Sequence, residues 1–470
     1  MLFSSMTFLW IYLPIVLLLC MCIRNLKWQN LLLVAASLLF YAWGEPRNIF
    51  LILFSILLNY GFGLLVSRVQ HHQKLVLAIC VLLNLALLFY YKYYTFFFNA
   101  VLTRFGVTGN VSIALPIGIS FFTFQALSYV VDVYRDRNTE HGVVAQRNVI
   151  NLALYISLFS QLIAGPIVKY KAIDAQLEER EMTLDEAAYG VKRFVLGLSK
   201  KVLISNTMAA AADAIFALSA QELGTSVAWI GAICYSMQIY FDFSGYSDMA
   251  IGLGKMLGFS FMENFNYPYL SKSIGEFWRR WHISLSTWFR EYLYIPLGGN
   301  RKGKRRTYVN LLLVFLATGI WHGANWTFLL WGLFHGVFIV LERAWLAEKL
   351  RKHPVLATVY TLLVVLCGWV LFRADSLSQA AFYLRAMFVW TPCGALSTPA
   401  FFINALTVTA AVVALLLCGP LQAVVPGMKR WIYDEDRISW SHSLLLIPLL
   451  GLCILCLSSG AYNPFIYFRF

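Results

Sequence analysis

The sequence predicts an all-α protein whose helices cross a membrane many times. Of its 470 residues, 60% are hydrophobic and only 13% are charged, whereas an average soluble domain has about 25% charged residues. Apolar runs of about 20 residues, the length that spans a bilayer, recur along the whole chain. No polar stretch is long enough for a separate soluble domain, so we predict one integral membrane domain over residues 1–470.

The net charge of +14 does not indicate a nucleic-acid partner. Lys and Arg lie in short segments between apolar runs, as the positive-inside rule requires, and no basic stripe is interleaved with aromatic residues. We therefore expect the lipid bilayer as the surroundings. The nine cysteines fall mostly within apolar runs. Cys20 and Cys22, and Cys453 and Cys456, are close in sequence, but neither pair has a further His or Cys nearby, so no metal site is predicted.

The order of apolar and basic segments predicts the topology. The candidate spans are residues 6–23, 29–43, 48–66, 75–98, 112–133, 149–168, 194–218, 227–257, 309–321, 325–343, 355–372, 398–418 and 443–459. The basic segments 68–74, 135–147, 192–201, 272–306, 343–352 and 429–437 are predicted to be loops in the cytoplasm. The N-terminus lacks the features of a cleavable signal, and we expect both termini outside.

Two apolar runs do not fit a simple count of crossings. The run 149–168 lies between two basic segments and contains Gly165-Pro166, which breaks a helix, so we expect a re-entrant segment. Residues 309–343 are too many for one span and too few for two, which need about 40 residues and a turn. We expect two short half-helices that meet at Gly319–Asn325. Such a break is tolerated only inside protein or beside a cavity, so His322 should lie at a buried hairpin tip next to a water-accessible space.

Two further segments, 273–294 and 376–389, are predicted to be amphipathic helices at the membrane surface. The first opens with Ser273 and Glu276 in the spacing of a capping box. Trp278, His282 and Ser286 are four residues apart and would share one face of that helix. An aromatic stripe of this kind is more often packing than a site, but the basic residues around His282 favour a function.

Two histidines in such places suggest proton transfer, because the pKa of histidine lies nearest to neutrality. A buried, neutral His322 would suit a general base that deprotonates a hydroxyl for attack on an acyl thioester. The chain has no Gly-x-Ser-x-Gly, His-Glu-x-x-His or P-loop motif. A packing role stays open for His322, and it is the expected role of His335.

A second polar cluster, Gln238–Asp248, interrupts another apolar run. It contains Asp242 and Asp248 together with several hydroxyl groups. Ionisable groups within a membrane often line a cavity, but hydrogen bonds between helices explain them equally well. Both interpretations stay open.

The chain also carries the motifs WRRWHISLSTW, GGNRKG, WHGAN, YFDFSGYSDMAIGLG, LPIGISFFTFQALSYVVDVYR and the ending NPFIYFRF. Together these resemble the membrane-bound O-acyltransferase (MBOAT) superfamily, most closely its bacterial alginate O-acetyltransferase branch, from Met1 to Phe470. The resemblance implies a ring of tilted helices with re-entrant half-helices around a central tunnel. It also implies that His322 is the catalytic histidine and that His282 takes a second, more variable position on the cytoplasmic side.

From this resemblance we expect an O-acetyltransferase that moves acetyl groups across the bacterial inner membrane and needs no cofactor. The donor would be a cytoplasmic thioester, acetyl-CoA or an acyl carrier protein. The acceptor would be an exported polysaccharide such as alginate or cellulose, or a cell-wall glycan. Expected partners are periplasmic acetyltransferase-like proteins and a polysaccharide synthase or secretion complex. The expected site residues are His322 and His282 for catalysis, and Asn325, Asp242, Trp321, Trp278, Arg301, Lys302 and Lys304 for substrate binding.

Two other functions share the same features. A transporter or channel also has broken helices and buried polar groups, and a structural subunit of a secretion complex would have a similar composition. The basic residues Arg301–Arg306 attract the donor's phosphates or an acidic carrier protein under the enzyme hypothesis, and only fix the topology under the others.

Overall fold

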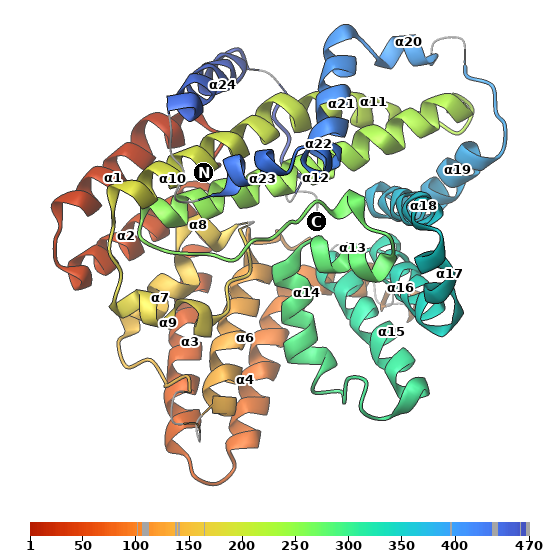
Figure 1. Ribbon diagram of the computed structural model, residues 1–470. Coiled ribbons are helices and arrows are strands. Elements are labelled where there is room, and N and C mark those ends of the chain that lie inside the picture. The colour runs from red at the N-terminus through yellow and green to blue at the C-terminus, as the bar shows by residue number, and fades with distance from the viewer. Residues whose placement is uncertain are drawn as a thin grey trace. The chain divides into compact units, whose positions relative to one another are not determined.

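The computed structural model describes residues 1–100, 102–105, 112–136, 139, 142–163, 165–394, 397–434, 440–460 and 462–466, and these residues form helices and no strand (Figure 1). The predicted all-α fold is therefore confirmed. Contacts within the chain divide it into unit 1, Met1–Phe194 with Ser247–Met262, and unit 2, Val195–Tyr246 with Glu263–Phe470. The single membrane domain, the ring and the re-entrant segments stay predictions.

Unit 1 is built from the N-terminal helices. They are a π-helical turn at Phe8–Tyr12, α1 (Leu13–Cys22), α2 (Leu26–Gly44), α3 (Ile49–Arg68), α4 (Gln73–Leu88), a π-helical turn at Phe89–Tyr93, α5 (Tyr94–Ala100), a 3₁₀ turn at Leu102–Phe105, α6 (Ile119–Asp136), α7 (Val149–Ser157), α8 (Phe159–Leu162), α9 (Tyr170–Glu178) and most of α10 (Leu184–Ser199). Phe8, Phe40 and Phe159 are fully buried and pack ring against ring, which ties α2 and α8 to the first helical turn.

Unit 2 holds the residues of both predicted catalytic segments. Its elements are a π-helical turn at Lys200–Ser205, α11 (Asn206–Phe216), most of α12 (Thr225–Met256), a 3₁₀ turn at Pro268–Leu270, α13 (Ile274–Arg280), α14 (Ile283–Phe289), a π-helical turn at Arg290–Tyr294, α15 (Gly303–His322), α16 (Trp326–Leu341), a π-helical turn at Glu342–Leu346, α17 (Ala347–Lys352), α18 (Pro354–Arg373), α19 (Leu377–Phe388), α20 (Pro399–Phe402), α21 (Ala405–Leu417), α22 (Pro420–Val424), α23 (Pro426–Tyr433) and α24 (Trp440–Ser458). Its core is rich in tryptophan and other aromatic residues, among them Trp281, Trp331 and Trp369.

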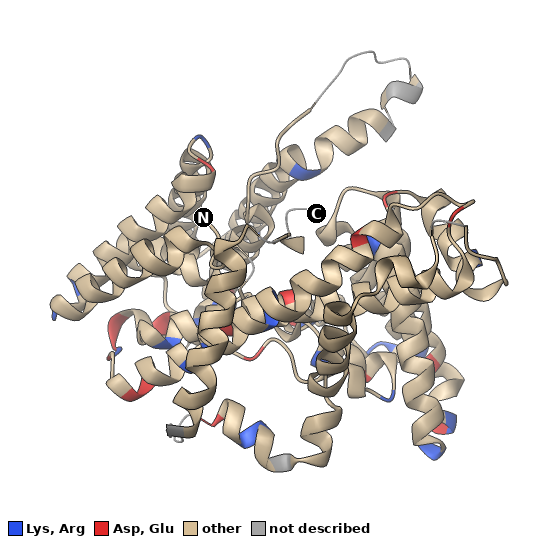
Figure 2. Ribbon diagram, turned by 90° about the horizontal axis from the view of Figure 1, so that it is seen from above, with Lys and Arg blue, Asp and Glu red and all other residues tan. Residues whose placement is uncertain are grey.

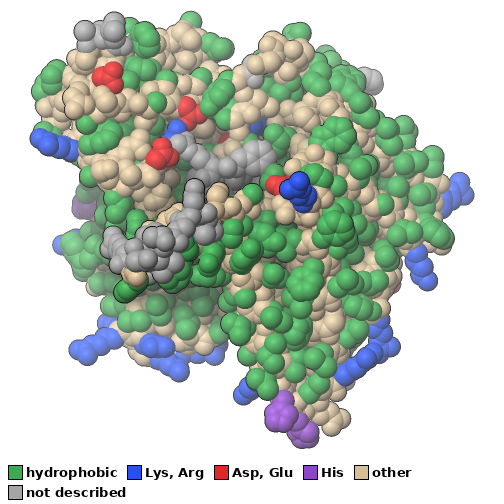
Figure 3. All heavy atoms as spheres, turned by 180° about the vertical axis from the view of Figure 1, so that it is seen from behind, with side chains coloured by type: hydrophobic (Ala, Val, Ile, Leu, Met, Phe, Trp, Pro, Cys, Tyr) green, Lys and Arg blue, Asp and Glu red, His purple; other side chains and the backbone are tan. Residues whose placement is uncertain are grey.

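Several helices are long and apolar enough to cross a bilayer. Within the described part of the chain these are 49–68, 73–99, 326–352, 354–373 and 441–458. Large hydrophobic side chains such as Phe50, Leu82 and Val355 are exposed on them. Hydrophobic side chains cover much of the face seen in Figure 3, and charged residues are sparse along the ribbon in Figure 2. Such a surface fits lipid surroundings, because lipid removes the cost of exposing apolar groups.

The helix of residues 149–168 is broken as the Gly-Pro pair predicts. α7 ends at Ser157, α8 ends at Leu162, and the described residues 163 and 165–169 lie outside any helix. Residue 164 lies outside the described residues, as do parts of the predicted basic segments 135–147 and 429–437 and the last four residues of the chain. Whether this segment is re-entrant in a membrane stays a prediction.

The basic segment 192–201 is not a loop, and that prediction was wrong. It lies within an unbroken helical stretch from Leu184 to Phe216, and the side chains of Arg193 and Lys201 are buried. Arg193 pairs with Asp248 at 2.5 Å inside unit 1, and Lys201 pairs with Asp242 at 2.6 Å inside unit 2. A buried charge is tolerated when it is paired, so these cations need no water-exposed loop.

Candidate functional site

The hairpin predicted around His322 is present, but its helices are longer than expected. α15 runs for 20 residues from Gly303 to His322, and α16 begins at Trp326 and continues through helical turns to Lys352. The basic residues from Lys304 onward form the first turn of α15, so the helix has about 30 Å of length, against the shorter half-helix predicted. The depth of the hairpin tip in the membrane stays a prediction.

Two glycines allow α15 and α16 to pack closely. A Cβ atom at Gly319 would lie 2.4 Å from the carbonyl oxygen of Phe328, and one at Gly332 would lie 2.3 Å from that of Phe315. Both distances are shorter than any real contact, so neither position accepts a side chain at this helix separation. Asn325 begins α16: its side chain accepts a hydrogen bond from the Thr327 amide at 3.2 Å. Asn325 therefore caps a helix, and its predicted role in substrate binding stays a prediction.

His322 lies at the end of α15 within an aromatic cage. Its side chain is 8% exposed, and its ring centroid lies 4.9 Å from that of Trp331 and 5.1 Å from that of Phe372. Beside it is a cavity of about 20 Å³, which is room for one water molecule. We call this cavity the His322 pocket; it is lined by Ile239, Phe243, Trp281, His322, Trp331, Trp369, Phe372 and Ile466.

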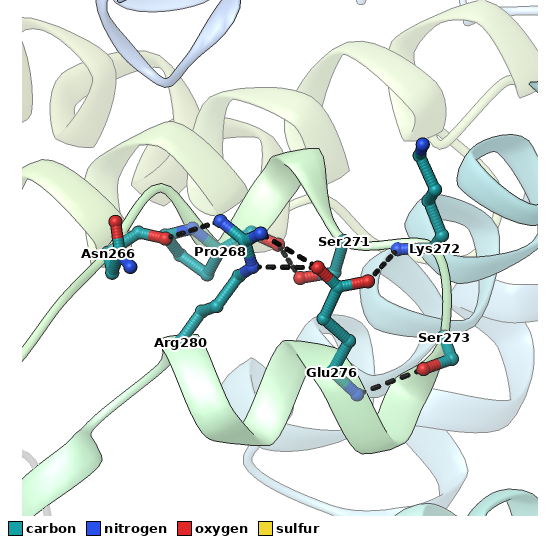
Figure 4. Close-up of polar contacts among 7 residues, drawn as sticks. All are labelled: Asn266, Pro268, Ser271, Lys272, Ser273, Glu276 and Arg280. Atoms are coloured by element: carbon teal, nitrogen blue, oxygen red, sulfur yellow. Dashed lines mark hydrogen bonds and ion pairs between the residues drawn. The ribbon is translucent and has the colours of Figure 1, made fainter. Parts of the chain in front are cut away.

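His282 lies where the predicted helix 273–294 breaks in two. α13 ends at Arg280, α14 begins at Ile283, and His282 between them has a left-handed backbone with φ of 44°. The prediction that Trp278, His282 and Ser286 share one helix face was therefore wrong. The capping prediction is confirmed in part. Ser273 Oγ accepts a hydrogen bond from the Glu276 amide at 3.0 Å, while the Glu276 carboxylate binds the Lys272 amide and Arg280 (Figure 4).

The tautomer of His282 follows from its neighbours. Its Nδ1 lies 3.2 Å from Oδ1 of Asn264, and the same oxygen accepts hydrogen bonds from the amide and hydroxyl of Ser284. Since this oxygen only accepts, Nδ1 carries the proton and Nε2 has the free lone pair. Burial lowers the pKa of His282 to about 3, so the ring is neutral. Nε2 has no hydrogen-bond partner among the described residues.

Trp321 joins the two histidines. Its ring centroid lies 6.2 Å from that of His282 and 5.0 Å from that of His322. Phe243 makes a second link, because it touches the His282 ring at 4.6 Å and also lines the His322 pocket. The structure therefore brings together three of the residues that the sequence singled out, although they lie on α15 and in the break before α14.

A larger cavity of about 970 Å³ opens among α13 to α18. We call it the basic cavity, because its lining includes Lys272, Arg279, Arg290, Arg343 and Arg351. The same lining has only two carboxylates: Glu276, which pairs with Arg280 at 2.8 Å, and Glu342, which accepts hydrogen bonds from the amides at the start of α13. Figure 4 shows the ammonium of Lys272 turned away from Glu276. The cations therefore leave this cavity with an excess of positive charge.

The sequence missed these cavity residues. Of the predicted substrate-binding residues, only Trp278 lines the basic cavity, and Arg301, Lys302 and Lys304 are exposed outside its lining. The sequence features that could have indicated this cavity are two. Arg279 lies one turn after Glu276, and Arg343 and Arg351 lie two turns apart in a segment predicted to be a loop. That signal becomes specific only once the fold brings the two segments together.

Asp242 holds the C-terminal segment in place. Its Oδ1 pairs with Lys201, its Oδ2 accepts a hydrogen bond from the Ile466 amide at 3.0 Å, and Lys201 also donates to the carbonyl of Pro464. Both oxygens are thus used between elements of unit 2, as the hydrogen-bonding interpretation of this cluster expected. Asp242 does not line either cavity, and it affects the His322 pocket through Ile466, which does.

A contact between two tryptophans connects the walls of the two cavities. Trp278 lines the basic cavity and Trp331 lines the His322 pocket, and the centroids of their rings are 5.5 Å apart. A molecule held in the basic cavity is therefore two aromatic rings away from His322.

Comparison with known proteins identifies the family. The family model described as MBOAT, membrane-bound O-acyltransferase family, matches residues 118–372. The chain is 43% identical to the probable alginate O-acetylase AlgI of Pseudomonas putida over the full length of both proteins. It is 34% identical to the peptidoglycan O-acetyltransferase of Helicobacter pylori, over 95% of this chain and 92% of the relative. It is 30% identical to the teichoic acid D-alanyltransferase of Bacillus subtilis, over 54% of this chain and 68% of the relative. The chain therefore belongs to the membrane-bound O-acyltransferase family and is a multi-pass acyltransferase of the inner membrane.

Proposed function

We propose that this enzyme takes acetyl groups from a cytoplasmic thioester and transfers them across the inner membrane for O-acetylation of an exported polysaccharide. The observation that carries the proposal is the pairing of an enclosed histidine pocket with a large basic cavity on the other side of the Trp278–Trp331 contact. The relatives named as alginate O-acetylases match over their whole length, which favours alginate or a similar glycan as the acceptor.

The basic cavity suits the phosphate-bearing part of the donor. Acetyl-CoA and an acyl carrier protein both present phosphate beside the arm that ends in the thioester. Arg279, Arg343 and Arg351 supply charge that attracts such groups over a distance. The exposed residues Arg301–Arg306 lie beyond this lining and are suited to steering the donor or docking an acidic carrier protein.

His322 acts as the general base in this mechanism. It accepts the proton of the acceptor hydroxyl while the hydroxyl oxygen forms a bond to the thioester carbonyl carbon. The carbon–sulfur bond then breaks, and the imidazolium returns the proton to the departing thiolate. Trp331 and Phe372 around His322 limit access of water, which would hydrolyse the thioester.

The acceptor is either the glycan hydroxyl or a hydroxyl of a periplasmic acetyltransferase-like protein that completes the transfer. A polysaccharide synthase or secretion complex would present the glycan. His282 supports the site by fixing Trp321 and Phe243 and is expected to matter less than His322.

The test is transfer of labelled acetyl groups by the purified protein, with and without periplasmic partners. Removal of a general base costs about 10²–10⁴-fold in rate, so His322→Ala should lose measurable transfer. His282→Ala should be milder. Protein yield and the melting temperature in detergent control for folding. A folded His322→Ala protein with near-normal turnover would refute the assignment of the base.

A further inference from the structure

His335 belongs to a buried cluster of polar groups that packing alone does not explain. Its side chain is 1% exposed, and neither ring nitrogen has a hydrogen-bond partner among the described residues. Within the same part of the chain, the indole nitrogens of Trp278 and Trp331 also lack partners. Most buried polar atoms in proteins are paired, and a group left without a partner is costly. The packing role expected from the sequence therefore explains why the ring of His335 is buried, but not why its two nitrogens lack hydrogen-bond partners.

The position of His335 links it to both cavities. Its ring lies 5.2 Å from Trp278, which lines the basic cavity, and 5.2 Å from Trp331, which lines the His322 pocket. Gly368 packs against the edge of the ring and accepts no larger side chain, because a Cβ atom there would lie 2.7 Å from Nε2 of His335. His335 therefore contacts one wall residue of each cavity.

We propose that His335 is a positioning residue for the acyl donor, whose pantetheine arm it binds through the arm's amide groups. A neutral imidazole offers one N–H donor and one nitrogen acceptor, and a secondary amide offers one of each in return. Acetyl-CoA and an acyl carrier protein share this arm, so the inference holds for either donor. Trp278 and Trp331 are in contact, so an arm that reaches the nitrogens of His335 must displace one of these rings. The inference rests on the proposed function.

The experiment compares two thioacetates of equal length with the full-length protein in detergent. One is S-acetylpantetheine, and the other is the thioacetate of a polyether thiol that lacks amides. One hydrogen bond is worth up to about tenfold, so His335→Leu should lower kcat/KM for S-acetylpantetheine about tenfold and leave the polyether probe unchanged. His335→Gln keeps a donor and an acceptor and should restore much of the loss. Phe338→Leu, one turn along α16, is the matched control for altered packing.

Equal loss with both probes, or no loss with either, would overturn the proposal and leave His335 a packing residue. Should His335→Leu not accumulate, His335→Met replaces it, because an unbranched side chain fills irregular space. If the wild-type protein releases thiol from neither probe nor from acetyl-CoA, the proposed function fails and this inference fails with it. If the wild-type protein turns over both probes but the His335 variants affect both equally, only the role of His335 is refuted and the proposed function stands.

Discussion

Gly332→Ala should slow acetyl transfer about 100-fold in a protein that still folds. A Cβ atom at this position would lie 2.3 Å from the carbonyl oxygen of Phe315, whereas ordinary contact begins at about 3.4 Å. The obstacle is backbone, so no side chain can turn away. The two helices α15 and α16 must therefore separate by about 1 Å near the residues that carry His322 and Trp331.

The effect on stability and the effect on rate can be estimated separately. Overpacking costs about 1–3 kcal/mol, and alanine recovers about 1 kcal/mol relative to glycine in a helix. The net loss of unfolding free energy should therefore be modest. A displacement of about 1 Å in a catalytic group can cost about 10²-fold in rate, because the reacting atoms no longer meet in line.

The assay measures initial rates of acetyl transfer at saturating donor together with the melting temperature in detergent. The matched control is Gly336→Ala, one turn further from His322, where the Cβ atom would meet the side chain of Phe315 at 3.1 Å and needs only a small adjustment. We expect this variant to keep most of its activity. A Gly332→Ala protein with wild-type turnover would show that close packing of the hairpin does not position His322.

Three further outcomes follow from the same structure. Neutralising Arg279 and Arg343 together should raise the KM for the donor, most strongly at low salt. Lys349→Gln changes a residue outside the cavity and should leave this KM unchanged. Equal effects on KM would show that the basic cavity is not the donor site. Because the folded-state pKa of His282 is about 3 and its ordinary value is 6.5, unfolding takes up a proton below pH 6.5. Stability should therefore fall between pH 6.5 and pH 3, by about 2 kcal/mol at pH 5, and His282→Gln should lose less stability over this range in detergent unfolding. A cysteine placed at position 303 should resist labelling from the periplasm of intact cells, and labelling there would disprove the predicted topology.

The helices were predictable because lipid imposes a simple rule on sequence. A span needs a long apolar run, and basic residues mark its ends, so most predicted spans match helices within a few residues. The exceptions are instructive. Lys201 and Arg193 looked like loop residues because their partners, Asp242 and Asp248, are more than 40 positions away in the chain. Pairing across helices removes the signal that an isolated charge gives.

The candidate site was predictable only in part, for a related reason. His322 stood out because a histidine within an apolar run is unusual. Asn325 stood out for the same reason, and its cap of α16 could not be told from the sequence. The basic cavity combines residues from α13 with residues near α17, and neither segment is unusual alone. Helical periodicity also failed at His282, since its left-handed backbone reorients every residue beyond it.

The contacts of His322, His282 and His335 separate their roles. His322 lines the small pocket itself, so it can meet an acceptor hydroxyl directly. His282 has its tautomer fixed by Asn264 and reaches that pocket only through Trp321 and Phe243, so its loss should disturb geometry more than chemistry. His335 contacts the wall of each cavity through Trp278 and Trp331 and can act only on a donor that has already entered. We therefore propose proton transfer for His322, support of the pocket for His282, and alignment of the donor for His335.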